Sequence, residues 1–102
     1  MPTFVEILTT LKRQIAATVA AGSVNRFYIG RSVDVEARLG EHGADEIRPL
    51  YETQSLTRAL DIEDELIKHF YNHPKNDNWQ EHAGGNVAEG RQHIYVALWF
   101  AP

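Results

Sequence analysis

The chain has 102 residues, which fits one compact domain, residues 1–102, and is too short to add a separate targeting domain. It has no cysteine and no apolar run near the roughly 20 residues that span a bilayer, so disulfides, thiolate metal sites and membrane spans are excluded and a cytoplasmic location is expected. A net charge of −4 counts against a general nucleic-acid binder, although Arg26, Arg31 and Arg38 fall close together and leave room for a local basic site.

Residues 3–21 have the features of a helix. Thr3 and Glu6 form a T-x-x-E capping box at its start, and Gly22 stands where the helix would stop. The apolar residues in between recur at helical spacing: Phe4, Ile7, Leu8, Leu11, Ile15 and Val19. Residues 25–30 are aromatic and β-branched, which predicts a strand that Gly30 ends, and residues 34–41 then predict a short helix.

The second half of the chain contains two further strands and one longer helix. Residues 46–53 alternate partly and predict a strand in which Pro49 favours an edge position or a bulge. A helix is expected from Ser55 to about residue 72, followed by a loop over residues 74–90 and a β-rich core strand over residues 93–100. The predicted fold class is α+β, with a small, three-stranded, mostly antiparallel sheet packed with three helices.

Glu63 stands out on the third predicted helix. Leu56, Leu60, Ile67 and Phe70 share one face at heptad-like spacing, and Glu63 completes this apolar stripe. A carboxylate on an apolar face is costly unless a cation meets it. The sequence leaves two interpretations open. Either Glu63 lies at the edge of the stripe or pairs with an arginine as part of the fold, or it is the single carboxylate ligand of a hard divalent cation.

Arg38 and His42 form a second candidate pair. They are four residues apart on the short predicted helix, so both project from one face. A guanidinium matches a phosphate in charge and in its forked donors, and an imidazole exchanges a proton near neutral pH. A solvated surface pair is the simpler account of these two residues alone. Together with Tyr28 at the end of a strand and Glu63 on the facing helix, they favour phosphate chemistry.

These residues resemble the signature of the GIY-YIG nucleases. Tyr28-Ile29-Gly30 matches the YIG motif, and Arg38 and His42 stand where that family has an arginine and often a histidine. Glu63, followed by a Leu-Ile-Lys sequence, is similar to the family's metal-binding glutamate. The resemblance extends over about residues 25–86, because Asn76 or Asn78 with Gly84-Gly85 is similar to the asparagine and Gly-Gly that follow the glutamate helix.

The GIY half of the signature is missing from its usual place before Tyr28, where the pattern is helical. We expect residues 93–100 to replace it by pairing with residues 26–30, since the ends of compact domains often lie close together and permit a permuted order. Period-two geometry would turn Tyr95 toward the cleft, within water-bridging reach of Arg38 or Glu63. It would also turn the apolar set toward the helices: Ile94, Val96, Leu98 and Phe100. Trp99 and Phe100 are expected as core residues rather than base-stacking platforms, and Trp79 fits either role.

The resemblance implies a metal-dependent endonuclease that hydrolyses nucleic-acid phosphodiester bonds, with DNA favoured over RNA and one Mg²⁺ (or Mn²⁺) on Glu63. It implies that Arg38 holds the phosphoryl oxygens. It further implies that Tyr28 and Tyr95 orient or deprotonate the attacking water and that His42 assists the same proton transfer. The expected substrate-binding residues are Gly30, Arg31 and Asn78, and Asn78 or Asn76 would also help tie the glutamate helix to the site. A homodimer or a separate targeting partner is also compatible with the sequence, and no membrane partner is expected.

Two other functions remain open. A catalytically inactive GIY-YIG-like fold could bind nucleic acid or protein, which the missing GIY strand and the acidic balance favour. An unrelated α+β interaction protein could carry Tyr28-Ile29-Gly30 by coincidence. The enzyme hypothesis requires Tyr28, Arg38, Glu63 and Tyr95 to converge on one cleft.

Overall fold

A computed structural model describes residues 2–78 and 88–102. In these residues three helices pack with one three-stranded antiparallel sheet, which confirms the predicted α+β class. The elements in chain order are α1 (Phe4–Val19), β1 (Val24–Ser32), α2 (Val35–His42), β2 (Glu46–Thr53), α3 (Leu56–Phe70) and β3 (Gln92–Phe100). Residues 79–87, which include Trp79 and Gly84-Gly85, lie outside the described residues, so the interpretations that involve them are not addressed.

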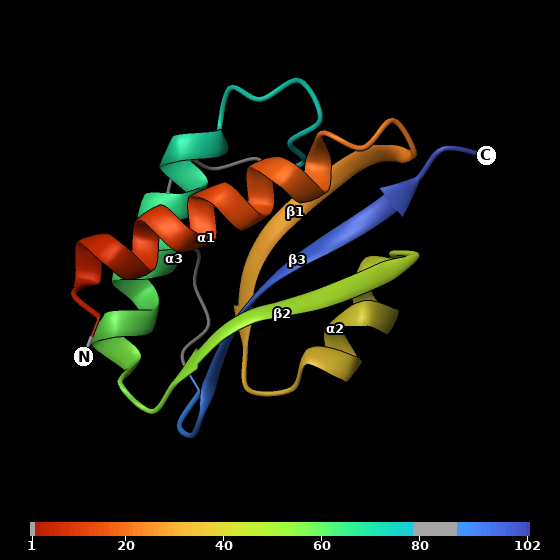
Figure 1. Ribbon diagram of the computed structural model, residues 1–102. Coiled ribbons are helices and arrows are strands. Elements are labelled where there is room, and N and C mark those ends of the chain that lie inside the picture. The colour runs from red at the N-terminus through yellow and green to blue at the C-terminus, as the bar shows by residue number, and fades with distance from the viewer. Residues whose placement is uncertain (1, 79–87) are drawn as a thin grey trace.

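The C-terminal strand β3 is the centre of the sheet, whose strand order is β1-β3-β2 (Figure 1). It pairs antiparallel with β1 from Val24↔Phe100 to Ser32↔His93, which confirms the predicted pairing of residues 93–100 with residues 26–30. On its other side it pairs with β2, whose register shifts between Pro49 and Tyr51. The proline therefore lies on an edge strand and beside a bulge, as predicted.

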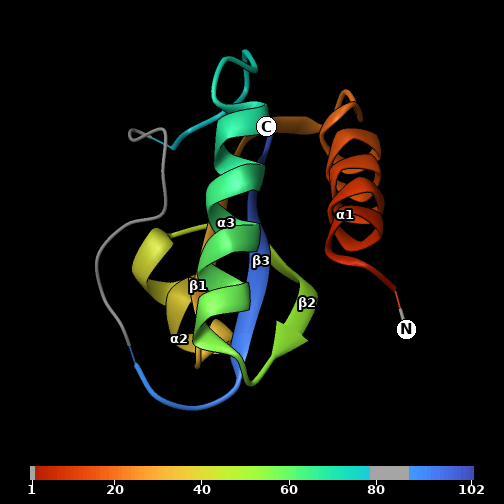
Figure 2. The ribbon, with the colours of Figure 1, turned by 90° about the vertical axis from the view of Figure 1, so that its left-hand side faces the viewer.

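The two faces of the sheet are covered by different helices. In Figures 1 and 2, α1 and α3 lie on one side of the strands and α2 lies on the other. On β3, alternate side chains point to opposite faces, so Ile94, Val96 and Leu98 join the hydrophobic core with α1 and α3. Tyr95 reaches His42 of α2 instead. This alternation was predicted from the sequence, and it separates the core face from the face that carries the candidate site.

Local signals explain the helix ends. The Thr3 hydroxyl caps α1 by accepting a hydrogen bond from the Glu6 amide, and Ser55 caps α3 in the same way through the Arg58 amide. Helix α2 ends at Gly43, whose positive φ of 63° favours glycine. In the described part of the chain, no helix is long and apolar enough to cross a membrane.

Candidate active site

Tyr28, His42 and Tyr95 come together on the α2 face of the sheet, from three separate elements. The His42 Nε2 atom lies 2.8 Å from the Tyr95 hydroxyl oxygen, and the rings of Tyr28 and His42 are 4.7 Å apart between centroids. Of the four residues that the enzyme hypothesis requires in one cleft, Tyr28 and Tyr95 therefore meet around His42, whereas Glu63 pairs with Arg31 on the core-facing side of β1. The meeting of Tyr28 and Tyr95 depends on the antiparallel pairing of β1 with β3, which brings the end of the chain beside the YIG strand.

Gly30 makes room for Tyr95. The two residues are register partners in the β1–β3 pair. A Cβ atom at position 30 would lie 2.4 Å from the Tyr95 hydroxyl oxygen and 2.5 Å from the ring carbon that bears it. Since real Cβ atoms do not come so close to another heavy atom, only glycine fits opposite this ring without displacing it. The expectation for Gly30 was substrate binding, and the structure gives it this packing role.

Arg38 acts electrostatically on the aromatic group formed by Tyr28, His42 and Tyr95, and is therefore a candidate for a phosphate contact. Its guanidinium pairs with Glu41 on the same helix, and about a third of its side chain is exposed. Its positive charge lowers the pKa of His42 and opposes the increase in the pKa of both tyrosines, so it lies within electrostatic reach of all three groups. An ion pair on a helix surface is weak, so an incoming phosphate can compete with Glu41.

Burial sets the protonation states of the site. It is the largest cause that raises the pKa of Tyr28 and of Tyr95 above 10, and the negative charge of Glu63 raises both further. Burial also lowers the pKa of His42 below 6.5, with Arg38 as the next cause. At neutral pH both phenols are therefore protonated and the imidazole is neutral. The imidazole, rather than a phenolate, is the group ready to accept a proton.

Glu63 is buried on α3, as its place in the apolar stripe predicts, and it meets an arginine. Its Oε1 accepts a hydrogen bond of 3.0 Å from Nε of Arg31, with side chains only 6% and 5% exposed. Burial raises the pKa of Glu63, while the charge and the hydrogen bond of Arg31 oppose that rise. The arginine pairing that the sequence left open is thus observed.

Arg31 is held in place by Gln92 at the start of β3. The Nη1 atom of Arg31 donates to Oε1 of Gln92 at 3.0 Å. The Gln92 amide nitrogen in turn donates to the carbonyls of Ala88 and Gly90. Arg31 was expected to bind substrate, but the structure points its side chain at Glu63 and away from solvent. Sequence reasoning missed Gln92, although both residues extend the apolar, core-facing alternation of their strands: Phe27 and Ile29 on β1, and Ile94 and Val96 on β3.

Asn78 ties the segment after α3 to β1. Its side-chain oxygen accepts from the amide of Ile29, and its side-chain nitrogen donates to the carbonyl of Ile29, both at 2.9 Å. Asn76 forms an isolated bridge with Phe27 close by. Asn78 therefore pairs with the backbone amide and carbonyl of Ile29 on the outer edge of β1, next to Tyr28. Asn78 was expected to bind substrate and to help tie the glutamate helix to the site, and the structure provides a backbone tether between the segment after α3 and β1.

The residues that could hold a metal are few. In residues 2–78 and 88–102, no group of three His, Asp or Glu side chains is arranged to hold an ion. A divalent cation would therefore depend on the one carboxylate of Glu63 together with oxygens of the substrate. Mg²⁺ is often bound in this way, since it keeps several of its waters. Glu63 pairs with Arg31 on the core-facing side of β1, whereas Tyr28, His42 and Tyr95 meet on the α2 face.

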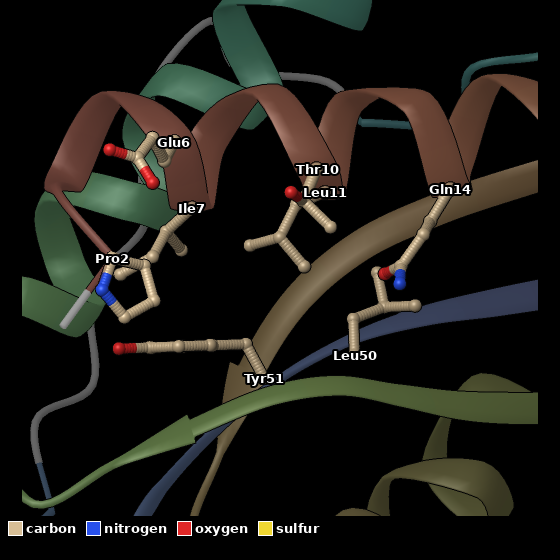
Figure 3. A pocket seen from close by; sticks show the side chains of 8 residues that line it. All are labelled: Pro2, Glu6, Ile7, Thr10, Leu11, Gln14, Leu50 and Tyr51. Carbon is tan, nitrogen blue, oxygen red and sulfur yellow. The ribbon is translucent and has the colours of Figure 1, made fainter.

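A separate cavity of about 350 Å³ lies on the other face, between α1 and β2 (Figure 3). Ile7, Leu11, Leu50 and Tyr51 supply most of its apolar wall. None of the expected catalytic residues lines it, so it is unrelated to the aromatic group.

Comparisons of the chain with protein-family models, curated proteins and solved structures found no match.

Proposed function

We propose that the protein is a metal-dependent endonuclease of the GIY-YIG type that hydrolyses nucleic-acid phosphodiester bonds. The observation that carries this proposal is the meeting of Tyr28, His42 and Tyr95 beside Arg38. The C-terminal strand stands in the centre of the sheet as the partner of the YIG strand. A permuted chain in which this strand replaces the missing GIY strand requires that arrangement.

In this proposal His42 is the general base. It is neutral at neutral pH because burial lowers its pKa, so it can take the proton of a water that attacks phosphorus. Tyr28 and Tyr95 stay protonated and orient that water through their hydroxyls, since their raised pKa values disfavour phenolate. The proposal thus gives the role of general base to His42, whereas the resemblance first implied that the tyrosines deprotonate the water.

Arg38 exchanges Glu41 for the scissile phosphate and stabilises the negative charge that grows on its oxygens in the transition state. Glu63 is the residue that would hold Mg²⁺ or Mn²⁺, because its buried carboxylate has the oxygen Oε2 besides the Oε1 that accepts from Nε of Arg31. Such an ion supplies Lewis-acid stabilisation of the leaving oxygen when bound. Arg31 holds Oε1 of the carboxylate and limits the orientations of the side chain.

The Arg31–Glu63 pair also favours a second candidate function, a catalytically inactive module that binds nucleic acid. A buried guanidinium at 3.0 Å already balances the charge of the carboxylate, and a neighbouring cation weakens the attraction for a metal ion. In this case the aromatic group and Arg38 would serve binding only.

A cleavage assay separates the two functions. Supercoiled plasmid, single-stranded DNA and RNA are incubated with the protein and Mg²⁺, Mn²⁺ or EDTA, and the products are resolved on gels. The endonuclease proposal expects cleavage that EDTA abolishes and that Glu63→Gln loses. Glu65→Gln, the same change two residues away on α3, is the matched control and should cleave normally. If wild type cleaves none of the substrates with either metal but still binds them, the inactive module is the correct function.

A further inference from the structure

We propose that Arg26 and Trp99 form a subsite for an unpaired nucleobase next to the reacting phosphate, so that the substrate is single-stranded or locally unpaired nucleic acid. This inference rests on the proposed function for the position of the phosphate. Neither residue belongs to the catalytic group described above. Both stand on the same face of the sheet as that group.

The β1–β3 register arranges this face as a row of cross-strand pairs. Gly30↔Tyr95, Tyr28↔Ala97 and Arg26↔Trp99 follow one another. Alternate residues of a strand share a face, so neighbouring pairs in the row are roughly 7 Å apart. That step is comparable to the distance between successive phosphates of an extended single strand. A chain whose phosphate lies at Tyr28 and His42 would therefore place its next nucleotide over the Arg26–Trp99 pair.

Both side chains of this pair are held in position while remaining accessible. The Arg26 guanidinium carbon lies 4.1 Å from the centroid of the Trp99 ring, and its Nη1 bonds Oδ2 of Asp77 at 3.0 Å. The indole N–H of Trp99 donates to the carbonyl of Gly43, and its ring meets that of His42 at 6.3 Å. The Arg26 side chain is nevertheless 45% exposed. A nucleobase that binds here contacts two side chains that are already ordered, which reduces the entropy cost of binding.

The charge balance favours a base over a phosphate at this place. Asp77 pairs with the Arg26 guanidinium and would repel a phosphate. Glu41 pairs with Arg38 in the same way, but the charge of Arg38 acts on Tyr28, His42 and Tyr95, where the reacting phosphate is proposed to lie. A guanidinium stacked on an aromatic ring still presents its outer plane, and nucleobases stack on such planes and on aromatic rings. In a duplex the base faces are covered by their neighbours. The subsite therefore selects an unpaired base.

Trp99 was expected in the core, but it lies outside the core cluster on the half-buried α2 face. Because Trp99 is half-buried in the proposed subsite, its fluorescence can report the binding of a nucleobase. The chain has two tryptophans, so Trp79→Phe leaves Trp99 as the single source of indole fluorescence. In that background, oligo(dT) is titrated in EDTA, so that no cleavage occurs, and compared with a duplex of the same length. We expect oligo(dT) to quench Trp99 and the duplex to leave it unchanged.

Arg26→Gln tests the same subsite without removing the tryptophan. It should weaken oligo(dT) binding about tenfold, in line with the loss of one stacked base. Arg48→Gln is the matched control, because Arg48 is also a strand arginine in a surface ion pair with a carboxylate and is 47% exposed. Circular dichroism of each variant checks that the fold is retained, and Arg26→Lys should rescue little because its ammonium has no plane on which to stack.

Three outcomes overturn the subsite: no quenching by oligo(dT), equal quenching by the duplex, or equal weakening by Arg26→Gln and Arg48→Gln. These outcomes are separate from the fate of the proposed function. Cleavage of plasmid without quenching by single strands refutes the subsite and leaves the endonuclease. Quenching without cleavage of any substrate refutes the endonuclease and supports the subsite in a binding module.

Discussion

Gly30→Ala should destabilise the protein, and the structure allows the size of the effect to be worked out. The new Cβ would lie 2.4 Å from the Tyr95 hydroxyl oxygen and 3.0 Å from a ring carbon of Tyr28. Relief by backbone movement is resisted because β1 is paired with β3 along its length. Relief by movement of the Tyr95 ring is also resisted, since the ring is 2% exposed and bonded to His42.

The expected cost is the sum of two losses and one gain. Overpacking a core costs typically about 1–3 kcal/mol, and breaking the Tyr95–His42 hydrogen bond costs about 1 kcal/mol more. Replacing glycine by alanine returns about 0.4–1 kcal/mol by restricting the unfolded chain. The net expectation is a decrease of about 2 kcal/mol in the free energy of unfolding. Urea denaturation followed by circular dichroism measures it.

Gly40→Ala is the matched control for this prediction. Gly40 lies in α2, and a Cβ there would meet no heavy atom within 4 Å. Because alanine is favoured over glycine inside a helix, the control should be more stable than wild type by roughly 0.5–1 kcal/mol. If Gly30→Ala is as stable as Gly40→Ala, the close approach of Tyr95 to Gly30 is wrong, and so is the placement of Tyr95 in the candidate site.

Glu63→Gln should abolish cleavage and also lower the free energy of unfolding by about 3 kcal/mol, because it removes the charge of the carboxylate that pairs with the buried Arg31; normal activity would remove Glu63 from the mechanism. Arg38→Ala should lower kcat at least about a hundredfold, and Arg38→Lys should rescue little because the forked donors are lost; full rescue would mean that a diffuse charge suffices. Activity should fall as pH falls through the lowered pKa of His42. In the same range the unfolded state, with a pKa near 6.5, binds the proton more readily than the folded state, so stability also falls with falling pH. A His42→Gln variant should lose this part of the pH dependence of unfolding, and an unchanged profile would contradict the burial of the imidazole.

Much of the fold could be predicted from local sequence. Capping at Thr3 and Ser55 marks two helix starts, and alternation along residues 93–100 separates the core-facing residues from Tyr95. The pairing of β3 with β1 followed from elimination, since the region before Arg26 is helical in pattern and β1 required a partner. The central place of β3, with β2 on its other side, came only from the structure. Glu63 was identified as unusual because a carboxylate interrupts an apolar stripe, a property of one helix that needs no knowledge of its neighbours.

What joins these residues into a site was decided by the tertiary structure. Period-two geometry tells which face a side chain takes, but the partner on that face depends on strand register and on the approach of a helix. Only the register pairs Gly30 with Tyr95, and only the packing of α3 on β1 brings Glu63 to Arg31 and not to Arg38. Protonation follows the same rule, because burial is the largest cause of each pKa shift at Tyr28, His42 and Tyr95. Burial is a property of the assembled fold, so no sequence pattern could have shown that the imidazole of His42, rather than a phenolate, is the group ready to accept a proton at neutral pH.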